Sequence, residues 1–173
     1  MKEITLRTAT PADAGAIRAI YAPNVEQRAV SFEEVTPSVE EFEQRISATL
    51  IKGFPYFVAE CDGKIVGYTY AGAFHPRSAY RHSVETTVYV ADGCHHQGIG
   101  RILVGALEAA LRQKGYRNCY AIIAYPCTAS DPHLTTDSVL FHERMGYTTV
   151  AHLHHCGKKF GRLYDVVYME HIL

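Results

Sequence analysis

The sequence predicts a single α/β domain, residues 1–173, in which a mixed β-sheet carries helices on both faces. A chain of 173 residues with 47% hydrophobic residues has the usual size of one domain and can build a substantial core. Segments with strand and helix periodicity follow in the order strand, helix, helix, three strands, helix, strand, helix, two strands. No repeat, low-complexity tract or linker interrupts this order, so we expect no internal domain boundary.

The N-terminal part predicts one strand and two helices. Residues 4–9 alternate apolar and polar side chains, and the alternation stops before Pro11. A helical period of apolar residues begins after Asp13. Ser38 caps a second amphipathic helix over residues 39–52. The stretch between the two helices is expected to be a loop or a short strand.

The middle of the chain predicts three strands and a helix. Residues 56–74 contain two β-rich runs joined by Asp62 and Gly63, which is the best hairpin signal in the sequence. Residues 83–90 form a third strand. Residues 98–113 carry apolar side chains on one helical face and predict a helix.

The C-terminal third is expected to contain a strand at 116–125, a helix at 138–145, and strands at 148–156 and 163–173. The first of these strands is nearly continuously apolar, as a central buried strand should be. The polar connection at 127–137 is longer than usual and is a candidate functional or mobile loop. Gly146 closes the helix, and the glycine-containing stretch 157–162 forms the last turn.

Composition excludes several classes of protein. Lys and Arg number 17 against 18 Asp and Glu, for a formal net charge of -1, which argues against a dedicated nucleic-acid binder. No stretch approaches the roughly 18 apolar residues of a membrane span, and the N-terminus has no secretory apolar core. The five cysteines contain no CxxC pair, which favours reduced thiols. Cys94 and Cys127 lie beside loops, but spacing reveals no activating partner. We expect a cytoplasmic protein.

Residues 89–111 run from a strand through a glycine-dotted loop into a helix. Such a helix start attracts anions, because its first N–H groups lack intrahelical partners and the helix dipole adds positive potential. A Rossmann fingerprint fails because Leu103 stands where the third glycine is required. A P-loop fails because Arg101 and Ile102 follow Gly100. A helix start that binds no ligand remains an alternative.

The loop sequence His95-His96-Gln97-Gly98-Ile99-Gly100 resembles the (Arg/Gln)xxGxG pyrophosphate loop of the GCN5-related N-acetyltransferases (GNAT), with His95 where Arg or Gln is usual. "VETTVYV", "FHERMGY" and the ending "GxxFGxxYDVVYM" occur in the order found in the phosphinothricin and methionine sulfoximine acetyltransferase branch. The resemblance runs from Ile4 to about Met169. It implies the GNAT fold, with a mixed, mostly antiparallel central sheet of about seven strands and helices on both faces, and a homodimer.

The resemblance also implies that acetyl-CoA is the cosubstrate. The backbone of Val88, Tyr89 and Val90 would pair with the pantetheine arm like an added strand. The residues implied to surround the pyrophosphate are His96, Gln97, Gly98, Ile99, Gly100 and Arg101. Glycines let the backbone approach closely, and a solvated surface role for Arg101 stays open. The departure at His95 weakens one side-chain contact and leaves the backbone cradle intact.

Two residues are candidate catalytic groups. Strand alternation places Glu85 on one face with Thr87 and Tyr89. The resemblance implies that Glu85 is the general base, acting directly or through water; a solvent-facing strand glutamate is the alternative. His142 stands where many GNAT proteins have a tyrosine that protonates the thiolate, and it is expected to act as acid or alternate base, unless it is structural. The backbone amide of Tyr89 or Val90 would stabilise the oxyanion.

Candidate substrate-binding residues lie in two segments: Phe32 and Glu33, and Arg77, Tyr80 and Arg81. Each has a solvated-surface alternative. Two arginines near the proposed base favour an acceptor that carries a carboxylate beside its amine over a polyamine. The residues of the ending that are expected to border the same pocket are Lys158, Lys159, Phe160 and Tyr164.

Two features depart from the simple pattern. His152, His154, His155 and Cys156 are metal-like ligand types, but in a strand His155 should point away from His152 and His154, so no metal site is expected. Relatives have a short "YPNxxS" link where this chain has "YPCTASDPHLTTDS". The asparagine of that link, which contacts the cofactor, has no safe counterpart here.

The sequence therefore predicts an acetyl-CoA-dependent N-acetyltransferase for the primary amine of a small amino-acid-like substrate of the phosphinothricin or methionine sulfoximine type. Another amine metabolite or a protein N-terminus is the alternative acceptor. A non-catalytic acyl-CoA-binding module is the alternative outside enzymes, and the presence of both Glu85 and His142 favours the enzyme. No metal, nucleic acid or membrane partner is expected.

Overall fold

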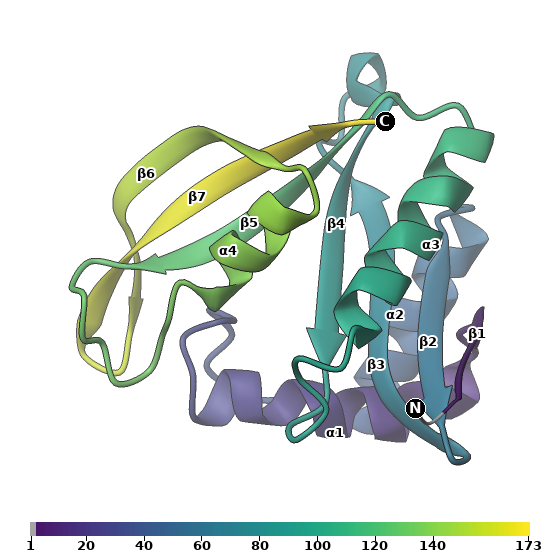
Figure 1. The fold of residues 1–173 in the computed structure, drawn as a ribbon, viewed down its shortest axis with the longest axis horizontal. Helices are drawn as coiled ribbons and strands as arrows, with labels where there is room; N and C mark the ends of the chain where they lie inside the picture. Colours follow the sequence, from purple (N-terminus) through teal and green to yellow (C-terminus); the bar gives the residue numbers. More distant parts are fainter. Residues whose placement is uncertain (1–2) are drawn as a thin grey trace.

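The computed structural model describes residues 3–173 and contains one seven-stranded sheet with the strand order β1-β2-β3-β4-β5-β7-β6. Neighbouring strands are antiparallel except β4 and β5, which are parallel. Helices α1 and α2 cover one face of the sheet, and α3 and α4 cover the other (Figure 1). The predicted fold class is confirmed.

The strands are β1 (Ile4–Thr8), β2 (Tyr56–Cys61), β3 (Lys64–Ala73), β4 (Ser83–Val90), β5 (Asn118–Pro126), β6 (Thr148–Lys159) and β7 (Arg162–Ile172). The helices are α1 (Ala14–Glu26), α2 (Val39–Ile51), α3 (Ile99–Gln113) and α4 (Asp137–Arg144), with 3-10 turns η1 (Pro11–Asp13) and η2 (Ser78–Tyr80). These bounds confirm the predicted order of elements. Within residues 3–173, no helix has both the length and the apolar character needed to cross a membrane.

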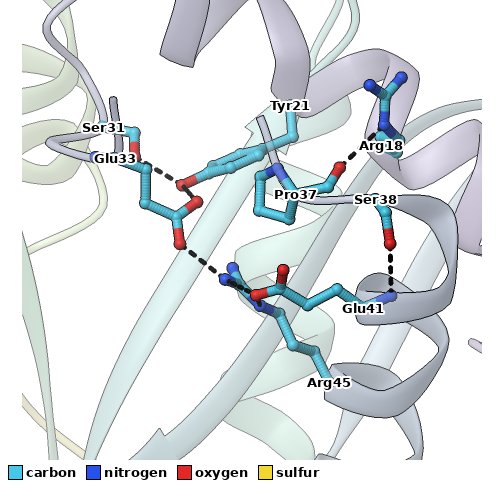
Figure 2. Close-up of polar contacts among 8 residues, drawn as sticks. All are labelled: Arg18, Tyr21, Ser31, Glu33, Pro37, Ser38, Glu41 and Arg45. Atoms are coloured by element: carbon cyan, nitrogen blue, oxygen red, sulfur yellow. Dashed lines mark hydrogen bonds and ion pairs between the residues drawn. The ribbon is translucent and has the colours of Figure 1, made fainter. Parts of the chain in front are cut away.

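The face covered by α1 and α2 has an aromatic core. Ile17 of α1 and Ile46 of α2 are fully buried against Tyr56 and Tyr68 of the sheet. As predicted, Ser38 caps α2: its hydroxyl accepts a hydrogen bond from the amide of Glu41 at 3.2 Å (Figure 2). The cap and the apolar stripe together fix where α2 begins and which face it buries.

The face covered by α3 and α4 has an aliphatic core. Leu103, Leu107 and Leu111 recur at the spacing of one helical face and are buried. Leu107 and Leu111 pack in the cluster that contains Val84 of β4 and Met169 of β7. This packing holds α3 against the centre of the sheet, so the position of its N-terminus is fixed.

The last hairpin differs from the expected turn. Strand β6 continues to Lys159, and the turn consists of Phe160 and Gly161, with φ of 49° and 70°. Two left-handed residues match the twist of a tight hairpin. Gly157 is therefore not a turn residue. It is a strand position where a Cβ would lie 2.3 Å from the ring of Phe32, a contact between distant segments that local sequence does not reveal.

Candidate active site

The sheet splits between β4 and β5. Only residues 83–85 of β4 pair with β5, at positions 118–120. Beyond this point β4 continues beside β3 while β5 continues beside β7, and Figure 1 shows the two strands diverging. The side-chain hydroxyl of Thr86 donates to the carbonyl of Tyr120 at 3.3 Å, just past the last pair. The rest of β4 is thus an open edge in the middle of the sheet.

Backbone alternation identifies which residues of β4 face the gap. The amide of Ala91 donates to the carbonyl of Val66 on β3 at 2.9 Å, and the register along β3 and β4 has no shift. In an antiparallel pair both backbone groups of a residue point to the same neighbour and the direction alternates. Tyr89 therefore faces β3, and Val88 and Val90 face the gap. The sequence offered the amides of Tyr89 and Val90 as candidates to stabilise an oxyanion. Of these two, only the Val90 amide faces the gap.

The loop before α3 presents unpaired amides. Gly98 is the N-cap of α3 with φ of 82°, and the first turn carries no acidic side chain. Within the described part of the chain, the amides of residues 99–101 donate to no backbone carbonyl. The side-chain amide of Gln97 donates to the carbonyl of Gly93 at 3.0 Å and braces the loop. His96 is exposed and has φ of 60°. This is the backbone cradle that an anion requires.

Side chains at the start of α3 have separate roles. Ile99 is buried, so only its backbone faces the loop. A Cβ on Gly100 would lie 3.2 Å from the ring of Phe141, so this glycine lets α4 pack against α3. Arg101 is exposed. The sequence assigned Gly100 to phosphate approach, and the structure gives it a packing role as well.

Glu85 lies at the apex of the split, in the last residue pair between β4 and β5, opposite Tyr120. Its side chain is half-buried. Burial raises the pKa of this carboxyl above its ordinary value, and the nearby His75 opposes the shift in part. A raised pKa makes the carboxylate a stronger base toward an amine proton. Sequence reasoning missed His75, because only folding brings the loop before β4 to Glu85.

His142 is buried on α4, with 6% of its surface exposed. Its Nδ1 lies 2.7 Å from the carbonyl oxygen of Ser138. A carbonyl only accepts, so Nδ1 carries the proton and Nε2 of the neutral ring is left as an acceptor. The rings of Phe141 and Tyr147 flank the imidazole edge-on, each with its centroid 5.1 Å away. Burial lowers the pKa of His142, which favours a neutral acceptor over an acid.

The two candidate catalytic residues lie on opposite faces of the sheet. Glu85 shares the α1–α2 face with Tyr89, whereas His142 packs with Tyr147 in the core under α3 and α4. Across residues 3–173, no hydrogen bond joins Glu85 to His142. The gap between β4 and β5 is the place where the two faces of the sheet meet.

The loop between α1 and α2 is fastened to the β6–β7 hairpin. Lys159 is 5% exposed, and its ammonium donates to the carbonyls of Arg28 at 3.1 Å and Ser31 at 2.6 Å. The ring of Phe32 covers Gly157. Phe32 is therefore held in place by a distant strand, as a wall of a binding pocket would need to be.

The long connection at 127–137 packs against that same loop. The amide of Ala29 donates to the carbonyl of His133 at 3.0 Å. Asp131 accepts from the amide of His133 at 2.8 Å and from the hydroxyl of Tyr164 at 3.3 Å. The insertion that the sequence identified thus supports the α1–α2 loop.

Glu33 is the polar centre of the loop between α1 and α2 (Figure 2). It accepts hydrogen bonds from the hydroxyl of Tyr21 at 2.8 Å and the guanidinium of Arg45 at 2.7 Å. The hydroxyls of Tyr21 and Ser31 are also hydrogen-bonded to each other, at 2.5 Å. The Glu33 carboxylate is therefore held by side chains from both α1 and α2.

Two tyrosines connect the candidate base to this loop. Burial raises the pKa values of Tyr70 and Tyr89, and the charges of both Glu33 and Glu85 add to each shift. Both carboxylates therefore act on the same aromatic surface, which consists of Tyr70 and Tyr89. Sequence reasoning did not assign this surface, although strand alternation places Tyr89 on the same face as Glu85.

The second group of substrate candidates lies around η2, apart from the α1–α2 loop. Tyr80 packs against the ring of His75 with centroids 4.9 Å apart, beside the histidine that acts on the candidate base. The guanidinium of Arg81 donates to the carbonyl of Ser78 at 3.3 Å. Arg77 and Arg81 are exposed. The structure packs Tyr80 against His75 and leaves both arginines at the surface.

The histidines on β6 follow the expected alternation only in part. His152 and His154 share a face, as predicted, and their rings stack with centroids 4.4 Å apart, but the expectation that His155 points away from them is wrong. The register between β6 and β7 shifts across residues 153–157, and His155 has φ of 52°. This bulge turns the amide of His155 onto the carboxylate of Asp165, at 2.7 Å. His152 and His154 reach the same carboxylate.

Comparison with known proteins places this arrangement in a family. The family model described as "Acetyltransferase (GNAT) domain" matches residues 6–168. A phosphinothricin N-acetyltransferase from Alcaligenes faecalis is 39% identical over 166 residues, covering 96% of this chain and 81% of that protein. The chain belongs to the GNAT acetyltransferase family, as its sequence motifs indicated, and it is an acyltransferase.

Solved structures agree. A phosphinothricin acetyltransferase of the GNAT superfamily from Sinorhizobium meliloti, in complex with acetyl-CoA, has a TM-score of 0.88 at 33% identity and covers 98% of this chain and 88% of its own. A ribosomal-protein-alanine N-acetyltransferase from Brucella melitensis has a TM-score of 0.89 at 34% identity, with coverage of 98% and 99%.

Proposed function

We propose that this enzyme transfers the acetyl group of acetyl-CoA to the primary amine of a small amino-acid-like substrate, with Glu85 as the general base. The observation that carries the proposal is the open edge of β4, which ends at Glu85. An extended ligand arm can add to that edge as a strand, and its anionic end then meets the unpaired amides of residues 99–101.

Residues of this chain would hold the cosubstrate, stabilise the oxyanion and accept the proton of the amine. When bound, acetyl-CoA supplies an activated thioester and a thiol leaving group. The backbone groups of Val88 and Val90 would hold the arm, and the amide of Val90 would stabilise the negative charge that develops on the thioester oxygen. Glu85 removes the proton from the attacking amine. The carbon–sulfur bond breaks as the amide bond forms, and the departing thiolate takes a proton from solvent. His142, which packs in the core on the opposite face of the sheet, supports the site structurally. These groups suffice, so the reaction needs no metal.

The acceptor class follows from the charges around the aromatic surface. Glu33, Glu85, Tyr70 and Tyr89 together favour a cationic ammonium group. Arg77 and Arg81 are the groups nearest in sequence to the base that suit a carboxylate. An α-amino acid has both charges. The relatives named for phosphinothricin support a substrate of that type.

A second acceptor is the α-amine of a protein N-terminus, which the relative from Brucella melitensis favours. Such an acceptor also presents an amine, but a chain replaces its carboxylate, so the arginines would have no partner. A non-catalytic acyl-CoA-binding module is the remaining alternative.

The proposal extends to the setting of the enzyme. Five free cysteines are typical of a reducing compartment, which supports a cytoplasmic location, and a formal charge of -1 supports an enzyme without a nucleic-acid or membrane partner. Exposed apolar side chains on β6 and β7, at Val150, Leu153 and Leu163, support a homodimer.

A thiol-release assay with acetyl-CoA tests the proposal. The amine panel contains phosphinothricin, methionine sulfoximine, methionine sulfone, a ribosomal-type N-terminal peptide and a polyamine. We expect acceptor-dependent CoA release with the three amino-acid analogues. Release with the peptide alone would establish the second acceptor, and binding of acetyl-CoA without release in any reaction would establish the module.

A further inference from the structure

The β6–β7 hairpin carries a side-chain cluster that acetyl transfer does not use. Nε2 of His152 lies 2.8 Å from Oδ2 of Asp165, and Nδ1 of His154 lies 3.2 Å from the same oxygen. The three ligand atoms all lie within 4.8 Å of one another. The two imidazole rings are stacked, with centroids 4.4 Å apart and planes 28° apart. Two ring nitrogens and a carboxylate oxygen thus converge on one point.

Among residues 3–173, Asp165 contacts histidines and no permanently charged cation. Its side chain is 8% exposed, and within residues 3–173 no Lys or Arg forms an ion pair with it. A buried charge is costly unless a counter-charge or a metal compensates it. The groups beside Asp165 that could carry a positive charge are histidines: His152 and His154, which are 36% and 70% exposed, contact Oδ2, and His155 also lies next to the carboxylate. A neutral imidazole is the commonest metal ligand.

The backbone orients the carboxylate for this role. The amide of His155 donates to Oδ1 of Asp165 at 2.7 Å, and the thiol of Cys127 donates to the same oxygen at 3.2 Å. These contacts leave Oδ2 directed at the two imidazoles. Hydrogen bonds of this kind hold the ligands of metal sites in orientation. The β-bulge at residues 153–157 is the feature of the backbone that places the His155 amide against Asp165.

We propose that His152, His154 and Asp165 bind one divalent transition-metal ion of the zinc type, outside the acetyl-transfer site. Ligands that bind zinc at its usual bond lengths in tetrahedral geometry lie about 3.4 Å apart. The present contacts to Oδ2 are slightly shorter, so a small outward movement of the rings admits the ion. The proton of each neutral ring then lies on its other nitrogen, and any second proton of a charged ring is released to solvent. Water completes the coordination.

The donor set selects the class of ion. Imidazole nitrogens suit zinc, copper, nickel and iron, whereas magnesium and calcium prefer all-oxygen sites. The thiol of Cys127 donates to Oδ1 and belongs to a second group, with His155 and Asp165, and not to the group of His152, His154 and Asp165. The proposed site therefore uses two nitrogens and one oxygen without sulfur. The exposure of His154 gives the ion a path from solvent.

The role of the ion is structural. It joins β6 to β7 beside Cys127, where the 127–137 connection leaves β5. That connection supports the α1–α2 loop through His133 and Ala29. A bound ion therefore stiffens the hairpin that also fastens Phe32 and Lys159, without touching the reacting groups.

Titration of the chelator-treated full chain with cobalt(II) and zinc tests the site. We expect one equivalent of cobalt to give the visible bands of four-coordinate geometry, without an intense sulfur-to-cobalt band, and zinc to displace it. Zinc should also raise the thermal midpoint of the wild-type protein, because an ion that binds only the folded state stabilises it.

Variants make the test specific. His154→Ala removes the most exposed ligand, so the fold is not at risk, and it should weaken cobalt binding at least about tenfold; Asp165→Asn should do the same. The matched controls His82→Ala and Cys156→Ser alter an exposed histidine and an exposed cysteine outside the cluster and should bind as wild type. Equal binding by His154→Ala, no binding at millimolar cobalt, or a sulfur-to-cobalt band would overturn the proposed site.

Discussion

The two faces of the sheet hold their titratable groups differently. On the α1–α2 face, Glu85 is half-buried at the point where β4 and β5 separate, and burial raises its pKa. On the other face, His142 is enclosed between aromatic rings, and burial lowers its pKa. Burial disfavours the charged form in both cases. The difference is access: Glu85 can meet a substrate, whereas His142 is part of the core. We expect Glu85 to control the reaction rate and His142 to control the free energy of unfolding.

The largest expected effect is on rate. Glu85→Gln keeps the shape of the side chain and removes the base, so kcat should fall about 10²- to 10⁴-fold. The free energy of unfolding should change by less than about 0.5 kcal/mol. Steady-state kinetics and urea unfolding measure the two quantities. Glu143→Gln, at an exposed position of α4, is the matched control and should retain full activity. A Glu85→Gln enzyme as fast as wild type would remove Glu85 from the mechanism.

His142→Ala should behave in the opposite way. Loss of a buried ring and of its hydrogen bond to Ser138 should lower the free energy of unfolding by about 2 to 4 kcal/mol. Urea unfolding at pH 8 measures the loss. If the variant were as stable as wild type, the assignment of His142 to the core would be wrong.

The difference in the free energy of unfolding between wild type and His142→Ala should be smaller in acid. Because burial lowers the pKa of His142 below 6.5, the unfolded chain takes up a proton at this residue before the folded chain does. The contribution is therefore fully present above the ordinary histidine pKa and is lost as pH falls through the lowered folded value. Unfolding of wild type and variant at pH 8 and pH 5.5 should show the smaller gap at the lower pH.

A smaller effect comes from two glycines of α3. Gly100→Ala places a methyl group against the ring of Phe141, whereas a Cβ at Gly105 has no atom within 4 Å. Gly100→Ala should cost about 1 to 3 kcal/mol through overpacking, and Gly105→Ala should stabilise by about 0.5 to 1 kcal/mol. Thermal unfolding of the two single variants measures both. Two stabilised proteins would mean that α4 does not press on the start of α3.

The smallest effect is on acceptor affinity. Gly157→Ala displaces the ring of Phe32, so KM for the amine should rise about tenfold, equivalent to about 1.4 kcal/mol, while KM for acetyl-CoA stays constant. Gly15→Ala in α1, with no atom within 4 Å of its Cβ, is the control. A matching rise in KM for acetyl-CoA would show that Phe32 does not belong to the acceptor side alone.

Local patterns predicted the elements, the glycine loop and the strand position of Glu85. The Ser38 cap and the apolar face of α3 are properties of short segments, so periodicity and capping rules reveal them. The phase of the β4 backbone was not predictable, because it depends on which neighbour each amide meets.

Contacts between distant segments were beyond local reasoning. Gly157 reads as a turn glycine until Phe32 covers it, and Lys159 reads as a surface lysine until it reaches Arg28 and Ser31. The bulge that redirects His155 depends on pairing with β7. These features come from long-range packing, for which the sequence contains no fixed spacing.

Amide hydrogen exchange with and without acetyl-CoA can show whether the cosubstrate lies on the open edge of β4. We expect the amides of Val88 and Val90, and those of residues 99–101, to exchange rapidly in the free protein and to become protected when acetyl-CoA binds. The amide of Tyr89 should be slow in both states, because it already faces β3. Unchanged exchange at Val88 and Val90 in the saturated complex, or protection at Tyr89 alone, would contradict the placement of acetyl-CoA on the open edge of β4.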